Sequence, residues 1–441
     1  MDARNLRRRF FQLHHPDDAT RSQWAYIAAA AVEHSVILTT SGAFLTLLIK
    51  QMNVSDALTG IISSFTTLAL GMQLFSVAFI RRRRSIRSSV LWMQTGQQLL
   101  YCLLFLLPFL PLPQAIKPAL CAVLLLVAAT LNNLIIPVKF NWLNSFVQQG
   151  RRGIFTAHRE MVSLFTGLVY NFLMSRAVDH FAAVDRPDIG LKLCALFMFI
   201  FTVCHAGALA AAKDAPAVLE EIRQNPPLLP AIRDHLTNPV FFRVLLFAIG
   251  WNFFSNFFTT YQTVFMLQEV SASATYIAVA GIVGSLVRIL VSPAMGKYSD
   301  KHGFAKGCGL GLCFAAASYI ILGFWQPGNG KLLYMLSTII NSIGLAAVFG
   351  GMVNLLFEYV ESRDRVSAMS VYCSLAGLGA FIGSLAGGAV LDAIQKAGNR
   401  FLGLSVYGQQ VLAVIATLGL LATVLYGKFI LEKTPRITAQ K

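Results

Sequence analysis

The chain has few charged residues for its length. Of its 441 residues only 13% are charged and 56% are hydrophobic, and the mean hydropathy is +0.62. An average soluble domain has about 25% charged residues. The composition therefore excludes an ordinary soluble globular protein, and we expect most of the chain to lie in a lipid bilayer.

Acidic residues are scarcer than basic ones, 20 against 36, and the formal net charge is +16. Such a charge is common in nucleic-acid-binding proteins. Here, however, the basic residues fall at the ends of apolar segments, where they meet anionic lipid headgroups. We therefore expect a bilayer with an anionic cytoplasmic leaflet as a partner, and no nucleic acid.

The sequence lacks the motifs of disulfide-rich, metal-binding and nucleotide-binding proteins. Its seven cysteines lie in apolar stretches without a Cys-x-x-Cys pair, so they predict neither a disulfide framework nor a zinc site. The tail segment 14–18, HHPDD, is interpreted as a solvated turn, and no metal is expected. Residues 328–331, GNGK, lack the spacing and the Ser or Thr of a phosphate-binding loop.

Catalytic motifs are also missing. We find no HExxH, no paired aspartates and no Ser-His-acid set within the apolar segments. We therefore expect neither an enzyme nor a cofactor.

The chain does contain twelve apolar stretches, each long enough to cross a bilayer, which takes about 20 residues. They are 24–49, 57–80, 87–108, 115–138, 161–181, 190–212, 240–267, 275–296, 305–325, 331–357, 366–395 and 406–431. The predicted fold is an all-α membrane protein with two six-helix halves, residues 1–212 and 240–441. A proline-rich cytoplasmic linker, 213–239, joins them.

Basic residues concentrate in alternate loops, for example at 81–84, RRRR, and Lys139 is assigned to a loop on the same side. Positively charged loops stay in the cytoplasm. We therefore predict a multi-pass protein of the cell (inner) membrane with both termini cytoplasmic.

The halves resemble each other weakly. Residues 151–159, RRGIFTAHR, follow the fourth span, and 363–369, RDRVSAM, follow the tenth. Each places a basic turn before a helix rich in small residues. Two repeated halves with a solute site between them are typical of secondary transporters.

The loop after the eighth span carries a more specific signal. Residues 296–306, GKYSDKHGFAK, resemble the cytoplasmic loop signature of the major facilitator superfamily. The resemblance implies a transporter working by alternating access, with a cytoplasmic gate formed by Gly296, Asp300, Lys301, Gly303 and Lys306. Phe304 replaces a usual basic residue, and the equivalent loop at 76–87 lacks the glycine and the acid. Asp300 is interpreted either as a latch or as a simple loop cap.

Two charged residues lie deep in predicted spans, where an ionised side chain is costly. Glu33 follows Trp24 by nine residues and Arg288 precedes Gly296 by eight, which places them about 14 Å and about 12 Å from the same membrane face. Glu33 is a candidate for proton coupling, with solute binding and structural pairing as alternatives. Arg288 is interpreted as a solute clamp, a partner of Glu33 or a structural residue. His34 is expected to be packed.

The resemblance also implies that spans one, four, seven and ten line the solute cavity. These spans carry amides and an aromatic ring that suit a polar organic solute, with a sugar-like solute favoured. The candidate residues are Asn132, Asn133, Trp251, Asn252, Asn256 and Asn341, together with Arg288.

We therefore expect a secondary active transporter of a small polar organic solute, with a proton as the co-substrate. The alternative is an exporter of amphipathic or drug-like compounds. The fifth span, 161–181, lacks the Gly-Pro signature that exporters of this family often carry.

Overall fold

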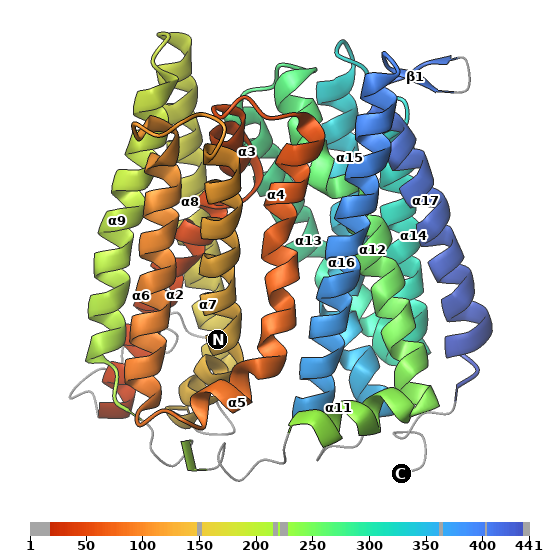
Figure 1. Cartoon of the computed structure of the whole chain (residues 1–441). Helices are drawn as coiled ribbons and strands as arrows, with labels where there is room; N and C mark the ends of the chain where they lie inside the picture. The colour runs from red at the N-terminus through yellow and green to blue at the C-terminus, as the bar shows by residue number, and fades with distance from the viewer. Residues whose placement is uncertain are drawn as a thin grey trace, which may run out of the picture.

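The computed structural model describes residues 18–147, 152–214, 219–220, 228–360, 365–401 and 404–434. These residues form a bundle of long helices (Figure 1). Eleven helices are long and apolar enough to cross a membrane, or up to twelve if one bent pair counts as a single span. The prediction of an all-α membrane protein is confirmed.

The first group of helices covers the chain up to Ala211. It comprises α2 (Asp18–Thr39), α3 (Gly42–Lys50), α4 (Asp56–Leu68), η1 (Ala69–Phe75), α5 (Ser76–Ile80), α6 (Ile86–Leu106), η2 (Leu107–Phe109), α7 (Lys117–Ser145), α8 (Arg152–Ala183) and α9 (Pro187–Ala211).

The second group begins within the predicted linker. It comprises α11 (Leu228–Thr237), α12 (Pro239–Gln268), α13 (Ala274–His302), α14 (Phe304–Leu322), α15 (Gly330–Tyr359), α16 (Arg365–Lys396), α17 (Gly408–Tyr426) and η5 (Gly427–Leu431). A short hairpin of β1 (Arg400–Phe401) and β2 (Leu404–Ser405) lies at the upper end of Figure 1.

The first predicted span, 24–49, is not one straight helix. The segments Thr20–Thr39 and Gly42–Lys50 meet at an angle of 44°. The hydroxyls of Thr39, Thr40 and Ser41 donate to carbonyls four residues earlier, at 2.9, 3.1 and 3.0 Å. Such bonds compete with the helical ladder and bend helices. Gly42 then takes a positive φ of 54°, which glycine adopts readily.

The fourth span extends beyond its predicted end at 138. Helix α7 runs to Ser145 through Pro137. Lys139, which the charge pattern assigned to a cytoplasmic loop, therefore lies within a helix and is buried. That assignment was wrong. From the sequence alone, a lysine that ends an apolar span cannot be distinguished from a lysine that lies inside the helix and forms an ion pair there.

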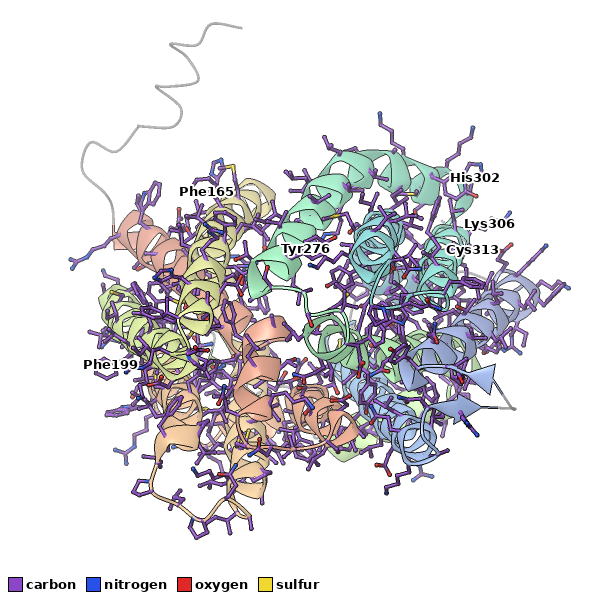
Figure 2. All side chains as sticks on the ribbon, turned by 90° about the horizontal axis from the view of Figure 1, so that it is seen from above. Phe165, Phe199, Tyr276, His302, Lys306 and Cys313 are labelled. Atoms are coloured by element: carbon purple, nitrogen blue, oxygen red, sulfur yellow. The ribbon has the colours of Figure 1, made fainter. Side chains whose placement is uncertain are left out.

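Buried side chains cluster separately on the two sides of the linker. One cluster draws all its buried members from Phe241 to Leu431. Three others draw theirs from Tyr26 to Leu219. The outward faces carry exposed apolar rings such as Phe165 on α8 and Phe199 on α9, which point away from the bundle (Figure 2). The linker residues 215–218 and 221–227 lie outside the described residues.

Among the described residues, several hydrogen bonds join the two groups. Gln395 donates to Asp56 at 2.8 Å next to the α3–α4 turn. Near the middle, the Ser374 hydroxyl donates to the Leu70 carbonyl at 3.4 Å. A Cβ added to Gly60 of α4 would lie 2.0 Å from Cε1 of Tyr261 on α12. The two groups thus approach closely at the end that carries the hairpin (Figure 1).

Candidate functional site

A buried ion pair joins two helices of the first group. Glu33 of α2 pairs with Lys139 of α7, and their side chains are only 14% and 7% exposed. Gln94 of α6 bridges them, since its Nε2 donates to Glu33 Oε1 at 3.0 Å and its Oε1 accepts from Lys139 Nζ at 2.9 Å. The same Nε2 lies 3.4 Å from Asn132 Oδ1. Three helices therefore converge on one carboxylate.

Burying two charges costs several kcal/mol per ion, and their attraction offsets this only when the remaining polar atoms are also bonded. Here both carboxylate oxygens of Glu33 accept hydrogen bonds. A buried pair is weak evidence for stability, whereas ionisable groups inside a membrane bundle usually mark a transport or proton pathway.

His205 of α9 is the third ionisable group of this site. It is fully buried, its Nε2 lies 3.9 Å from Glu33 Oε2, and neither ring nitrogen has a hydrogen-bond partner among the described residues. The sequence reasoning missed it. The available signal was an ionisable residue within a predicted span, 190–212.

A cavity of about 200 Å³ opens beside the pair. Its lining includes Glu33, His34, Asn132, Lys139 and the ion-paired Arg159 and Glu160 of α8. Both signs of charge therefore face the same space. Such a cavity suits a solute that donates and accepts hydrogen bonds.

The two predicted asparagines of α7 behave differently. Asn132 lines the cavity. Asn133 is buried, its Oδ1 accepts from Gln73 at 2.8 Å and its Nδ2 donates to the Ala129 carbonyl at 2.9 Å. Its amide is thus bonded within the protein. His34 packs against Gly167 of α8, where an added Cβ would lie 2.4 Å from the imidazole Cδ2.

The predicted face of α12 is half-buried. Asn252 and Asn256 each donate Nδ2 to a carbonyl four residues earlier, at 2.9 Å in both cases. Their Oδ1 atoms accept no hydrogen bond from another described residue. Trp251 packs against the core of the second group. Asn341 of α15 has a buried Oδ1 without a partner among the described residues.

Arg288 lies at a different cavity, of about 350 Å³, between α13 and α15. Its guanidinium stands 5.2 Å from the centroid of the Phe349 ring. The pairing of Glu33 with Arg288 that matched depth suggested is not formed in this structure. Lys139 takes the place of Arg288 because it lies on a helix of the same group.

The predicted gate residues surround the end of α13. Gly303 ends the helix with a φ of 95°, as expected for a tight turn. Among the described residues, no neighbouring helix approaches Gly296 closely, since a Cβ added there would meet no atom within 4 Å. Asp300 and Lys301 are exposed. Lys306 lies 3.8 Å from Glu432, and its side chain and that of His302 point away from the bundle (Figure 2).

Metal chemistry has no evident donor set in the part of the chain that the structure describes, where no three His, Cys, Asp or Glu residues come together. Of the tail segment 14–18, only Asp18 is described.

Comparison with known proteins finds one family model and several solved structures that are similar to this chain. A model of the Major Facilitator Superfamily matches residues 264–441. No curated protein matches the sequence. An auto-inhibited POT family peptide transporter is 15% identical, with 95% of this chain and 98% of that chain covered and a TM-score of 0.73. The nucleoside transporter NupG is 13% identical, with 92% and 98% covered and a TM-score of 0.67.

A bacterial homologue of the lysosomal transporter Spinster is 15% identical, with 94% and 96% covered and a TM-score of 0.61. At these identities the comparisons show a shared fold, and the family model adds a sequence match within the second group of helices. The described chain therefore has the fold of these transporters, and residues 264–441 are similar in sequence to the Major Facilitator Superfamily.

Proposed function

We propose that this chain is a secondary active transporter of a small polar organic solute, driven by protons that bind at Glu33. The buried ion pair between Glu33 and Lys139 carries the proposal, because it opens onto a cavity lined by charged groups. Protonating Glu33 removes the charge that holds Lys139. A proton thereby acts on the solute cavity directly.

The solute replaces Glu33 as a partner of Lys139. When Glu33 is neutral, the Lys139 ammonium keeps Gln94 as a hydrogen-bond partner but lacks a counter-charge. An oxygen of a bound solute supplies the missing partner. Proton and solute then favour the same state, and coupling between two ligands of this kind is reciprocal.

The composition of the candidate residues favours a sugar-like solute. Because Asn252 and Asn256 use their Nδ2 atoms within α12, their Oδ1 atoms remain to accept from hydroxyl groups. The similar structures include a peptide transporter and a nucleoside transporter. These are also polar organic solutes, and they define the alternative substrates for a transport assay.

The charge pattern supports a cytoplasmic position for the lower end of Figure 1, where α5 and α11 lie. Arg81, Arg82, Arg83 and Arg84 follow α5 at that end. A reporter fused after Pro227 should be cytoplasmic, and one fused after Lys396 should be outside. A cytoplasmic signal from the second fusion contradicts this orientation.

Asp300 is proposed to latch the cytoplasmic side when the transporter faces outward. It is exposed here, in a structure whose two groups meet at the opposite end. Asp300→Asn should abolish or uncouple transport without loss of folding. Full transport by this variant would make Asp300 a simple loop residue.

The coupling role of Glu33 is tested in proteoliposomes with a proton-sensitive dye inside. Labelled sugars, nucleosides and dipeptides are supplied outside under an inward proton gradient. Glu33→Gln should lose proton-driven accumulation and solute-induced acidification but keep solute exchange at zero gradient. The matched control Asp392→Asn changes an exposed carboxylate that pairs with Lys396 at 2.7 Å. Accumulation by Glu33→Gln equal to that of the control would refute proton coupling at Glu33.

A further inference from the structure

A second concave site lies at the turn between α5 and α6, away from the ion pair. Its volume is about 460 Å³. One side is formed by three consecutive arginines, Arg82–Arg84, and by three serines of the α6 N-terminus. The other side is apolar. The lining residues of that side are Phe79, Trp92 and Met93.

The polar side suits an anionic group. No acidic residue lines the cavity, although the Asp214 carboxylate accepts from the Arg87 N–H in the first turn of α6 at 3.1 Å. Arg82 and Arg84 are exposed. Ser85 caps the helix by accepting from the Ser88 N–H at 3.1 Å. Asp214 and Ser85 thus already bond N–H groups of this helix end. The exposed guanidinium groups of Arg82 and Arg84 therefore supply the charge that attracts a phosphate group.

The apolar side distinguishes a lipid from a dissolved anion. Trp92 follows Ser85 and Ser88 by seven and four residues, so the three share one face of α6. Its side chain is 74% exposed, although it lies within a helix apolar enough to span a membrane. Trp92 follows the first residue of α6 by six residues, or about 9 Å along the helix axis into the membrane. That depth matches the headgroup–acyl boundary, where tryptophan is enriched.

We propose that this cavity binds one anionic phospholipid of the surrounding leaflet. The lipid phosphate lies between Arg82, Arg84 and the Ser88 hydroxyl. Its acyl chains run along Trp92 and Phe79. Arg83 stacks on Phe79, with its guanidinium 4.4 Å from the ring centroid, and so orders the loop around the headgroup. General attraction between basic loops and a leaflet needs no cavity, whereas this site predicts a single lipid held in one place.

The test uses native mass spectrometry of the full chain titrated with phosphatidylglycerol or phosphatidylcholine. The wild-type chain should retain one phosphatidylglycerol in preference to phosphatidylcholine. Arg82→Gln with Arg84→Gln should weaken that retention about tenfold, the effect of losing about 1.4 kcal/mol. The control is Lys428→Gln with Lys433→Gln, which removes the same charge from exposed positions after α17. It should retain the lipid as the wild-type chain does.

A second measurement locates the acyl chains. Phosphatidylglycerol with brominated tails should quench tryptophan fluorescence in the wild-type chain, and Trp92→Phe should remove most of that quenching. Inorganic phosphate at millimolar concentration should not displace the lipid. Displacement by phosphate together with absent quenching would identify a free-anion site and overturn the proposal.

Equal lipid loss in both double variants would also overturn it, because diffuse attraction would then suffice. A variant with Arg82→Lys and Arg84→Lys keeps the charge. The melting temperature of each variant is measured to show that the variant is folded. Retention at the wild-type level by a folded Arg82→Gln, Arg84→Gln chain refutes the site directly.

Discussion

The carboxylate of Asp179, near the end of α8, caps the first turn of α13 by accepting from the backbone N–H of Thr275 at 2.7 Å. Its other oxygen accepts from the N–H of Ala274 at 2.9 Å. A side chain of the first group of helices thus satisfies backbone donors of the second. Since the cap exists only while the two groups are in contact, it stabilises the state closed at the hairpin end.

Removing this cap should favour opening at that end. Asp179→Ala loses two hydrogen bonds to a charged group, about 1.5–3 kcal/mol each at most, as well as a favourable charge at a helix N-terminus. Spin labels at Val184 and Gln268 should then report longer distances in a larger fraction of molecules. Asp185→Asn, which removes an exposed carboxylate in the turn after α8 and suits its positive φ of 56°, serves as the control. Unchanged distance distributions in Asp179→Ala would show that the cap does not stabilise the closed state.

The buried pair should show strong coupling in a thermal-stability cycle. Lys139→Gln alone leaves the Glu33 carboxylate buried without its counter-charge, which costs about 3–5 kcal/mol. Adding Glu33→Gln should recover part of that loss, with a coupling energy of about 1–3 kcal/mol. Additive effects of the two changes would mean that they do not interact in the folded protein.

The same cycle run with Arg288→Gln in place of Lys139→Gln should be additive, because Arg288 lies beside Phe349 in another cavity. Strong coupling between Glu33 and Arg288 would reveal that another state brings them together.

The contact of Gly60 with Tyr261 should not tolerate a side chain. In Gly60→Ala the new methyl would overlap the tyrosine ring, whose hydroxyl donates to the Ser384 carbonyl at 2.6 Å. Overpacking of this kind costs about 1–3 kcal/mol. We expect a lower melting temperature than for Gly281→Ala, where an added Cβ meets nothing within 4 Å. Equal melting temperatures would show that the tyrosine moves aside freely.

Glu269, between α12 and α13, predicts a pH dependence at the closed end. Burial raises the pKa of Glu269, and the nearby Asp56 carboxylate raises that pKa further, while Lys50 opposes the shift. A carboxyl with a raised folded-state pKa contributes stability below its unfolded pKa and loses that contribution as pH rises through the folded value. The melting temperature of the wild-type chain should therefore fall from this source above about pH 4.3.

Glu269→Gln should lack that component of the pH profile and should be the more stable chain at pH 7. Melting curves from pH 4 to pH 8 for both proteins test this. Parallel profiles would show that Glu269 contributes nothing to the closure.

The amide face of α12 gives a kinetic prediction. If the Asn256 Oδ1 accepts from a solute hydroxyl, Asn256→Ala should raise the apparent KM about tenfold through the loss of roughly 1–2 kcal/mol. Asn133→Ala, which removes an amide bonded within the protein, should leave KM unchanged in molecules that fold. An unchanged KM in Asn256→Ala would assign this face to helix packing.

Much of the fold was predictable because apolar length and loop charge are local properties. The structure places a helix in each of the twelve predicted spans, and the third, Ile86–Leu106, begins within one residue of its predicted start at 87. The bend after Thr39 was not predicted, since hydroxyl groups within an apolar stretch lower its hydropathy only slightly. The tight turn at Gly303 followed from a local motif, and the positive φ agrees with it.

The candidate site was less predictable because it depends on which helices are neighbours. Glu33 stood out as an acid in lipid, but its partner had to come from contacts between α2 and α7. Depth in the predicted spans pointed to Arg288, whereas Lys139 was counted among the cytoplasmic loop residues. The roles of Gln94 and His205 likewise depend on the packing of α6 and α9 around one carboxylate.

The bend between α2 and α3 divides one membrane-spanning stretch into two helical segments. The longer segment, α2, carries Glu33 and packs against α8 and α9 in its own group of helices. The shorter segment, α3, buries Phe44 and Leu48 in a core cluster of its own group and also contacts α12 and α13 of the other group. The bend at Thr40 and Ser41 thus links the helix that bears Glu33 directly to a short helix in contact with the other group.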